Sequence, residues 1–329
     1  MKKIRWGVLS TAKIGVEKVI PAMQAGKFSE ITAIASRNWQ KATTQANKLK
    51  IKKAYGSYDE LLADGTIDAV YNPLPNHLHV DWSIKSLAAG KHVLCEKPIG
   101  LNYEDAKRLQ NEATKYPDLK IMEAFMYRHH PRILKTRELI DTQAIGKVQN
   151  IHAVFTYNNT DPVNIRNQAD IGGGGLLDIG CYCISISRFF FDAEPHCVSA
   201  FIDYDPNLKI DRLGSVILKF QNGSATFTCA TQLFPQQHVV ISGQLGKIEI
   251  EIPFTPQPDK RTKLSHYTEV DKFEYIFDPC DQYTIQGDLF SEAILNKKPV
   301  PTPLTDATAN MRVIDKIFES AKTGKFISL

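Results

Sequence analysis

One lysine stands where an apolar run of the sequence ends. Val93-Leu94-Cys95 is followed directly by Glu96-Lys97-Pro98. Proline has no backbone N–H and fixes its own φ, so a strand ending here cannot simply continue. Ligands of open α/β sheets bind beyond the carboxyl ends of the strands. Lys97 is therefore either a surface charge at a turn or a catalytic group beside a bound ligand.

A second set of side chains that could do chemistry lies in the middle of the chain. Gly172–Gly175 is a run of four glycines, which allows unusual backbone angles and close packing on a ligand. The segment that follows has helical spacing, so Asp178 and Tyr182 stand at i and i+4 on one face. The pair is either an acid–phenol site beside a glycine loop or a buried tyrosine bonded to an aspartate after a floppy loop.

The first strand-to-helix turn indicates what the sheet binds. The six residues that follow the strand 4–9 have the spacing of the G-x-G-x-x-G motif. Ser10 and Ala12 occupy the first two glycine positions, and Gly15 occupies the third. Such a turn lets a pyrophosphate approach the N-terminus of a helix. We predict a dinucleotide at this turn, although a plain turn of small residues is the alternative. The residues expected to hold it are Ser10, Thr11, Ala12, Lys13 and Ile14.

The end of the second strand bears on which dinucleotide is bound. An NAD site usually places an Asp or Glu there to hold the ribose hydroxyls. This chain has Ser36 and Arg37 instead, and no acid. A guanidinium fork can bind a 2′-phosphate, which an acid would repel. We therefore expect NADP(H), with NAD(H) less favoured; a solvated arginine at a strand end is the alternative for Arg37.

Residues 1–124 alternate between short apolar runs and segments with helical spacing. Strands separated by helices indicate βαβ units and a parallel sheet. Pro21 lies inside the first helical segment, where it should kink the helix or loosen one turn. The predicted strands are 4–9, 31–35, 67–71, 92–95 and 120–124, and the predicted helices include 14–24, 77–89 and 102–115.

Residues 125–329 have a different pattern, in which strands follow one another without helices between them. Asn222-Gly223 is a strong hairpin signal. We expect a mostly antiparallel sheet. The predicted strands are 148–155, 197–204, 213–220, 224–231, 238–243 and 246–252, with helices at 131–141, 283–296 and 305–322.

Composition argues against several classes of protein. The 329 residues are 43% hydrophobic and 23% charged, as in a packed globular chain. A net charge of +4 without a basic run gives little support to a nucleic-acid partner. No run approaches the roughly 18 apolar residues of a membrane helix.

Six cysteines without a C-x-x-C pair, and no signal-like segment, predict a cytoplasmic protein. His77 and His79 would point apart on a helix, so we expect no metal.

Taken together, the sequence resembles the glucose–fructose oxidoreductase/inositol dehydrogenase (Gfo/Idh/MocA) family over essentially its whole length. The resemblance is carried by the turn 10–15 and by the segments 72–77, 96–98 and 178–182. Within the family, the chain is similar to the branch of dimeric dihydrodiol dehydrogenase and NADP-dependent D-xylose dehydrogenase. Like that branch, it has a tyrosine at position 182, where most of the wider family has histidine.

The resemblance implies an α/β fold: an N-terminal Rossmann domain with a parallel sheet (1–124), then an α+β domain with a large open, mostly antiparallel sheet (125–329). It implies a homodimer or homotetramer formed through the open sheet. It also implies hydride transfer between nicotinamide C4 and a carbinol carbon of a sugar or cyclic diol. The further residues expected at the cofactor are Pro73, Leu74, Asn76, His77, Glu96 and Lys97, with a plain helix cap as the alternative for Asn76.

A mechanism follows for such a reaction. Loss of hydride from a carbinol requires that the hydroxyl proton leave too, so a general base is needed. Tyr182 can act as that base if a nearby ammonium, Lys97, favours its phenolate. Asp178 can orient substrate hydroxyls or hold Lys97 charged. Arg128 and Phe155 are expected to contact substrate, although a helix-start role for the arginine and a core role for the phenylalanine are the alternatives.

Two other functions compete with this one. A glycosidase of the same fold uses tightly held NAD for transient oxidation, and would favour an acid near position 37. A non-catalytic dinucleotide-binding regulator would have lost Lys97 or Tyr182, and this chain has both.

Overall fold

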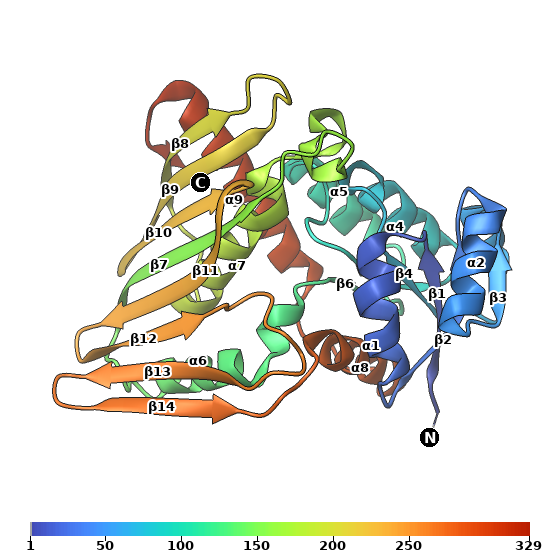
Figure 1. The fold of residues 1–329 in the computed structure, drawn as a ribbon, viewed down its shortest axis with the longest axis horizontal. Coiled ribbons are helices and arrows are strands. Elements are labelled where there is room, and N and C mark those ends of the chain that lie inside the picture. Colours follow the sequence, from blue (N-terminus) through green and yellow to red (C-terminus); the bar gives the residue numbers. More distant parts are fainter. Residues whose placement is uncertain (1) are drawn as a thin grey trace. The chain divides into compact units, whose positions relative to one another are not determined.

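The computed structural model describes residues 2–329, and these divide into two compact units (Figure 1). The first unit runs to Met126 and also includes Asp281–Thr308. The second comprises Tyr127–Cys280 and Ala309–Leu329. The division differs from the expected domain 125–329, because a helix near the C-terminal end returns to the first unit.

The first unit contains a parallel sheet of six strands in the order β3-β2-β1-β4-β5-β6. Except for the half-buried edge strand β3, its strands are buried on both faces, as expected when helices cover both sides of a parallel sheet. The strand order reverses between β1 and β4, and at such a switch point open α/β sheets bind their ligands. The strands are β1 (Ile4–Leu9), β2 (Ser29–Ala35), β3 (Lys53–Tyr55), β4 (Ala69–Asn72), β5 (His92–Cys95) and β6 (Ile121–Glu123).

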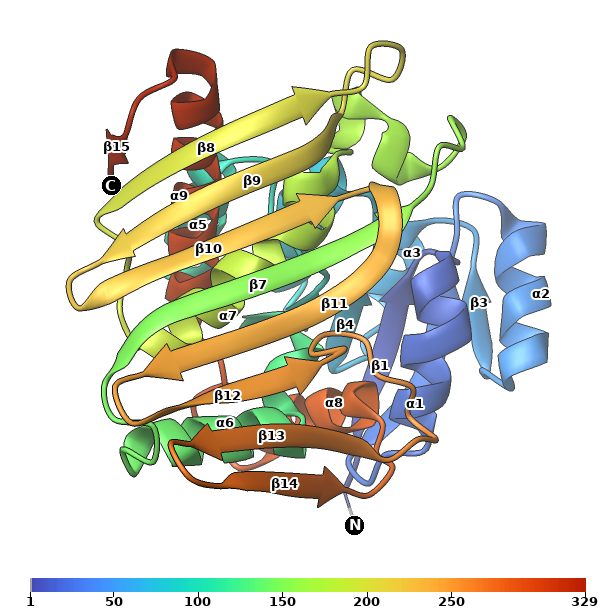
Figure 2. The same ribbon diagram turned by 60° about the vertical axis from the view of Figure 1, so that its left-hand side comes forward.

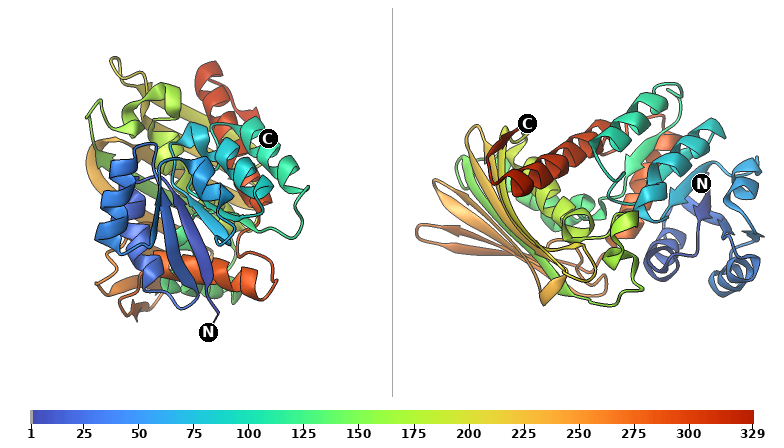
Figure 3. Two further views of the ribbon diagram at one scale, coloured as in Figure 1. Left: turned by 90° about the vertical axis from the view of Figure 1, so that its right-hand side faces the viewer. Right: turned by 90° about the horizontal axis from the view of Figure 1, so that it is seen from above.

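Helices pack on both faces of this sheet (Figure 3, left). On one face lie α1 (Ile20–Gln24), α2 (Trp39–Leu49) and α8 (Gln282–Leu295). On the other lie α3 (Tyr58–Ala63) and α4 (His79–Ala88), and α5 (Tyr103–Ala113) packs beside α4.

Helix α8 belongs to the first unit because it completes the core of the parallel sheet. The buried Trp6 ring of β1 lies 5.6 Å from the ring of Phe290. The Trp6 Nε1 donates a hydrogen bond to Ser291 Oγ at 3.2 Å. Helical spacing predicted this helix, but nothing in its own sequence indicated which sheet it packs against.

The first helical segment widens before Pro21, as the sequence predicted. A π-helical turn covers Gly15–Val19, and α1 follows with Pro21 in its first turn. Proline has no N–H for the regular helical bond, and π-turns commonly occur where that bond ladder is interrupted.

The second unit is built on a sheet of nine strands in the order β14-β13-β12-β11-β7-β10-β9-β8-β15 (Figure 2). Neighbouring strands are antiparallel except β7 and β10. The fold class expected from the sequence is thus confirmed. The strands are β7 (Val148–Asn158), β8 (Cys197–Tyr204), β9 (Asp211–Phe220), β10 (Gly223–Ala230), β11 (Gln232–Gly243), β12 (Gly246–Glu251), β13 (Thr262–Thr268), β14 (Lys272–Phe277) and β15 (Ile327–Ser328).

One face of this sheet is covered by helices and the other is bare (Figure 3, right). The covering helices are α6 (Pro131–Asp141), α7 (Cys181–Phe191) and, from residue 309, α9 (Leu304–Thr323). In β9, buried and exposed residues alternate along the strand, as expected for a sheet with one solvated face. The predicted hairpin at Asn222-Gly223 joins β9 to β10, with Gly223 paired to Phe220.

Four strands were not predicted from the sequence: the three-residue edge strand β3 in the first unit, and β13, β14 and β15 in the second. β13 and β14 lie at one end of the sheet, where their side chains are largely polar or exposed, so hydrophobic alternation is weak. β15 has only two residues. Among residues 2–329, one helical stretch, 169–191, is apolar and long enough to cross a membrane, but 89% of its most apolar window is buried in the protein.

Candidate active site

The first group of predicted residues lies at the carboxyl ends of β1 and β4. Ser10 has a φ of 100°, a conformation that favours glycine. Its Oγ accepts a hydrogen bond from the Ala12 N–H at 3.2 Å and lies 3.5 Å from the Pro73 carbonyl. A Cβ on Gly15 would lie 3.6 Å from the Pro73 and Tyr71 side chains. Ser10 thus keeps the backbone geometry of the glycine that it replaces, and its hydroxyl closes the turn.

The same turn leads into a helix whose first residues are accessible. Lys13 is exposed, and Thr11, Ala12 and Ile14 are half-buried. The first N–H groups of a helix have no partner within it, and they favour anions. The turn 10–15 can therefore offer backbone donors to a phosphate.

Beyond β2, the two predicted phosphate-binding residues differ in exposure. Ser36 is buried, and its Oγ accepts a hydrogen bond from the Asn38 N–H at 3.2 Å. Arg37 is exposed and within hydrogen-bonding reach of Tyr58. Burial raises the pKa of Tyr58, and the guanidinium opposes that shift. The Arg37 fork is therefore available at the surface, beside a strand end without an acid.

The loop after β4 is held by a buried polar network. Asn72 donates to the His79 carbonyl at 3.1 Å and to Ser83 Oγ at 3.2 Å. The His79 ring nitrogens lie 2.6 Å from the Leu74 carbonyl and 2.7 Å from the Pro98 carbonyl. Burial is the largest effect on this ring and lowers the pKa of His79 to about 4, although both carbonyls favour its protonated form. His79 thus ties the loop after β4 to the loop after β5.

This network positions the remaining predicted cofactor residues. Pro73 and Leu74 are buried in the loop, Asn76 is half-buried, and His77 is exposed on a short 3₁₀ turn. His79 is buried beside this loop, where its ring is held by two backbone carbonyls.

Glu96 and Lys97 follow β5 directly. The Tyr71 hydroxyl donates to Glu96 Oε1 at 2.7 Å, and the Glu96 N–H donates to the Asn72 carbonyl at 3.0 Å. Burial, and after it the Glu96 charge, raises the pKa of Tyr71. Glu96 is therefore held against β4 by Tyr71 and Asn72, and the half-buried Lys97 is the next residue.

In the second unit, the glycine run packs against its own chain. Gly174 has a φ of 117°, and a Cβ there would come within 1.8 Å of Asp211 Oδ1. Asp211, from β9, accepts the Leu176 N–H at 2.5 Å and so caps the helix that begins there. Burial raises the pKa of Asp211 to about 7. The glycines therefore make room for a carboxylate of the protein, and the loop is anchored.

Asp178 lies at the centre of a hydrogen-bonded cluster, which we call the Asp178 cluster: Tyr157, Arg166 and Asp178. The Tyr157 hydroxyl donates to Asp178 Oδ2 at 2.8 Å. Arg166 Nε donates to the same oxygen at 3.0 Å. Burial, followed by the Asp178 charge, raises the pKa of Tyr157, and the Asp178 charge is the main cause of a raised pKa for Arg166. The carboxylate thus accepts hydrogen bonds from a phenol on one side and a guanidinium on the other.

Tyr182 is 5% exposed and lies in a cage of aromatic rings. Its ring centroid is 5.7 Å from Tyr127, 5.6 Å from Phe155 and 5.3 Å from Phe254. Phe155 also stacks on Phe254 at 5.1 Å. The structure therefore brings Phe155 and Tyr182 together, and these rings fix the direction of the phenol.

Arg128 contacts α7. Its guanidinium donates to Ser185 Oγ at 2.7 Å and lies 5.4 Å from the Phe189 ring, so it braces α7. The substrate contact of Arg128 stays a prediction. The sequence showed a basic residue near a helix start, but not the direction in which its side chain packs.

Three residues of this region were not predicted from the sequence. Phe254 comes from a loop, Asp211 from a strand, and Arg166 from a polar segment without periodic spacing. One signal was available: Arg166 is the single Lys or Arg between Lys147 and Arg188.

Two family models match the chain. The model of the oxidoreductase family with an NAD-binding Rossmann fold (GFO/IDH/MocA) covers residues 4–124. The model of the GFO/IDH/MocA C-terminal domain covers residues 133–249. The chain belongs to the GFO/IDH/MocA family of oxidoreductases. The resemblance seen in the sequence is thus confirmed.

Similar proteins are dehydrogenases and reductases. A D-xylose 1-dehydrogenase (NADP(+)) of Haloferax volcanii is 34% identical over 98% of this chain and 99% of its own. A trans-1,2-dihydrobenzene-1,2-diol dehydrogenase of Xenopus laevis is 34% identical over 75% of this chain and 74% of its own. The structure of a 3-ketoreductase from Actinomadura kijaniata with NADP and TDP-benzene has a TM-score of 0.91 and 30% identity, covering 97% of this chain and 98% of that one.

Proposed function

We propose that this family member is an NADP-dependent oxidoreductase that transfers a hydride between nicotinamide C4 and a carbinol or carbonyl carbon of a sugar or cyclic diol. The observation that carries the proposal is that one helix presents both the caged Tyr182 and the held carboxylate of Asp178, in a chain with a dinucleotide-type turn. The xylose and dihydrodiol dehydrogenases and the ketoreductase named above support it.

The residues present fit NADP(H). Ser10 keeps a glycine-like backbone in the turn that would carry the pyrophosphate, and the helix start behind it supplies N–H donors. Arg37, exposed beyond β2, would hold the 2′-phosphate. When bound, NADP(H) would accept or supply the hydride.

The chain's own residues would handle the proton. We propose that Tyr182 takes the proton of the substrate hydroxyl during oxidation and returns it during reduction. The Lys97 ammonium would favour the phenolate and donate to the developing alkoxide. Asp178, fixed by Tyr157 and Arg166, would orient substrate hydroxyls. Structures of the A. kijaniata ketoreductase include one tyrosine variant and two variants of one lysine, which fits a Lys–Tyr pair.

The two competing functions have less support. Arg37 stands where a tightly held NAD would favour an acid, so nothing favours the glycosidase. Both Lys97 and Tyr182 are present, which argues against a regulator without catalysis.

A substrate panel tests the proposed function. Aldoses, ketoses and cyclic diols would be assayed with NADP(H) and NAD(H) in parallel, following the absorbance of the reduced nicotinamide. We expect turnover of at least one member, with kcat/KM for NADP(H) at least about 10-fold above that for NAD(H). Firm NADPH binding with no turnover of any member would favour the regulator instead.

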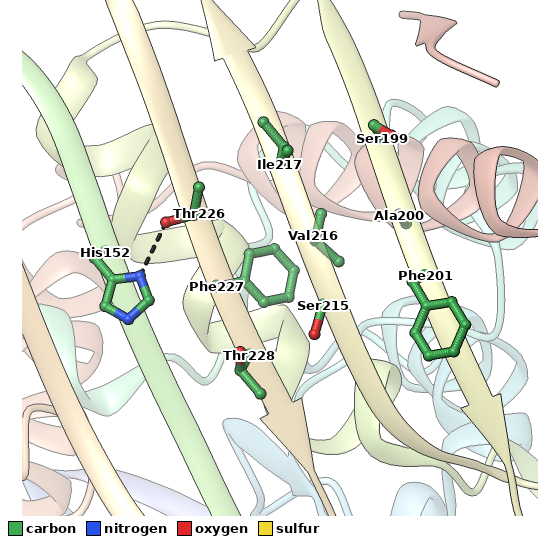
Figure 4. A pocket seen from close by; sticks show the side chains of 10 residues that line it. All are labelled: His152, Ser199, Ala200, Phe201, Ser215, Val216, Ile217, Thr226, Phe227 and Thr228. Atoms are coloured by element: carbon green, nitrogen blue, oxygen red, sulfur yellow. Dashed lines mark hydrogen bonds between the residues drawn. The ribbon is translucent and has the colours of Figure 1, made fainter. Parts of the chain in front are cut away.

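The bare face of the nine-stranded sheet suggests an assembly. It carries exposed apolar side chains, among them Phe201 (64% exposed) and Ile217 (43%). These border a hollow of about 380 Å³ that is also lined by His152, Thr226 and Thr228 (Figure 4). Phe155 of β7 points to the opposite, helix-covered side, so this hollow is separate from the aromatic cage of Tyr182. Large exposed apolar patches mark interaction sites.

We propose that two copies of the chain cover this face in a homodimer, or in a homotetramer built from such dimers. Phe201→Lys combined with Ile217→Lys should shift the protein to monomers in sedimentation velocity, because paired faces would then bury charges without partners. Leu134→Lys, on α6 and 53% exposed, is the matched control and should leave the assembly intact. A monomeric wild-type protein at micromolar concentration would contradict the proposal.

We also propose a cytoplasmic location. Within residues 2–329 no disulfide joins the six cysteines, which fits a reducing compartment.

A further inference from the structure

The backbone at Arg166 is fixed by the glycine run. Its carbonyl accepts the Gly174 N–H at 2.8 Å. A Cβ on Gly173 would lie 2.7 Å from that carbonyl, so only glycine permits the approach. The Asn164 side chain caps the short turn by accepting the Arg166 N–H at 3.1 Å. The position of this arginine is therefore set before any ligand binds.

One nitrogen of the Arg166 guanidinium is bonded to Asp178, and the other two can bind another group. Its Nε donates to Asp178 Oδ2, and among residues 2–329 this is the one side-chain hydrogen bond that the guanidinium makes. The side chain is 42% exposed, whereas that of Asp178 is 11% exposed. Since Nε holds the carboxylate, the two Nη amino groups remain as donors for another acceptor.

The charge of Arg166 lies close to the proposed base. The Asp178 charge keeps the guanidinium protonated, and an ionised Tyr182 would favour it further. Charged or titratable groups around Asp178 include Tyr157 from β7, Arg166 from the loop and Asp211 from β9. Arg166 therefore brings unused donors to the neighbourhood of Tyr182.

We propose that Arg166 is a substrate-recognising residue, and that its two Nη groups bind oxygens on adjacent substrate carbons, including the hydroxyl next to the reacting carbinol. The inference rests on the proposed function and names the substrate feature that the site requires, a vicinal pair of oxygens. The outer edge of a guanidinium presents parallel N–H groups, which match paired oxygen acceptors. Asp178, on the inner edge, holds that fork in place.

A comparison of two substrates shows whether Arg166 binds the substrate itself or only holds Asp178 in place. The best sugar or diol of the panel would be compared with its deoxy analogue, which lacks the hydroxyl beside the reacting carbinol. For Arg166→Met we expect kcat/KM to fall about 10- to 50-fold with the parent compound and less than about 3-fold with the deoxy analogue. Arg166→Lys keeps the charge but loses the fork, so it should recover part of the parent activity.

Two controls test whether the loss of any arginine, or altered cofactor binding, explains the result. Arg261→Met removes another arginine of the second unit, one that is 72% exposed, and should change neither substrate's kcat/KM. NADPH binding, followed by its fluorescence, should be the same in all variants. If Arg166→Met does not fold, Arg166→Lys carries the test, with a larger loss expected on the parent compound than on the deoxy analogue.

The possible outcomes are distinct. Equal losses on both substrates would overturn the inference, because Arg166 would then act only by holding Asp178. Unchanged kcat/KM on the parent compound would overturn it as well, and either result would leave the proposed oxidoreductase intact. A wild-type protein that turns over no panel member refutes the proposed function, and the inference falls with it.

Discussion

Replacing Tyr182 with phenylalanine is expected to lower kcat by about 10²- to 10⁴-fold, because the reaction would lose the group that takes the hydroxyl proton. The substitution removes only an oxygen atom, so the ring should stay in the cage formed by Tyr127, Phe155 and Phe254. Steady-state kinetics on the best substrate of the panel would measure kcat, and fluorescence titration would measure NADPH binding. We expect the latter to be unchanged.

Lys97→Met should produce a loss of similar size, since the phenolate would no longer be favoured by a cation. Tyr127→Phe is the matched control for the tyrosine. It removes a buried phenol oxygen from the same cage, one that lies 2.8 Å from Ser185 Oγ, and should cost less than about 10-fold. Near-normal turnover by purified Tyr182→Phe or Lys97→Met would refute the assignment of that residue.

The sequence predicted which residues of this site share a helix but not which residues contact them, and Asp178 shows why. Helical spacing was enough to place Asp178 and Tyr182 on one helix. The partners of Asp178 come from β7 and from a loop, as Tyr157 and Arg166. Those contacts depend on how β7 and the loop pack against the helix, which no local pattern encodes. The glycine run was visible, but the carboxylate for which it makes room lies on β9.

The fold could be predicted from the sequence where burial produces a regular pattern of apolar residues. Continuous apolar runs separated by helices predicted the parallel sheet, whose strands are covered on both faces. The alternation of buried and exposed residues in β9 matches a sheet with one bare face, which the family resemblance implied. Where solvent reaches both sides, as along β14, the pattern faded and the strand was missed. The same limit applied to α8, whose helical period does not show that Phe290 meets Trp6.

The second large effect is expected at the cofactor's 2′-phosphate. Arg37→Ser combined with Ser36→Asp should lower the ratio of kcat/KM for NADP(H) to that for NAD(H) by roughly 10²- to 10³-fold. The first change removes an exposed guanidinium. The second adds a carboxylate that repels the phosphate and can accept hydrogen bonds from ribose hydroxyls. The new carboxylate can also accept the Asn38 N–H that Ser36 Oγ accepts now, so the loop should persist.

Single substitutions separate the two contributions. Arg37→Ser alone should raise the KM for NADP(H) about 10- to 100-fold and change that for NAD(H) little, since only the former carries the phosphate. Lys48→Ser, at the far end of α2 and also exposed, controls for the loss of one positive charge and should leave the ratio within about 3-fold. Arg37 also lies within reach of Tyr58, so thermal unfolding would be measured for each variant. A ratio that stays constant in Arg37→Ser would show that the preference for a dinucleotide is set elsewhere than at the end of β2.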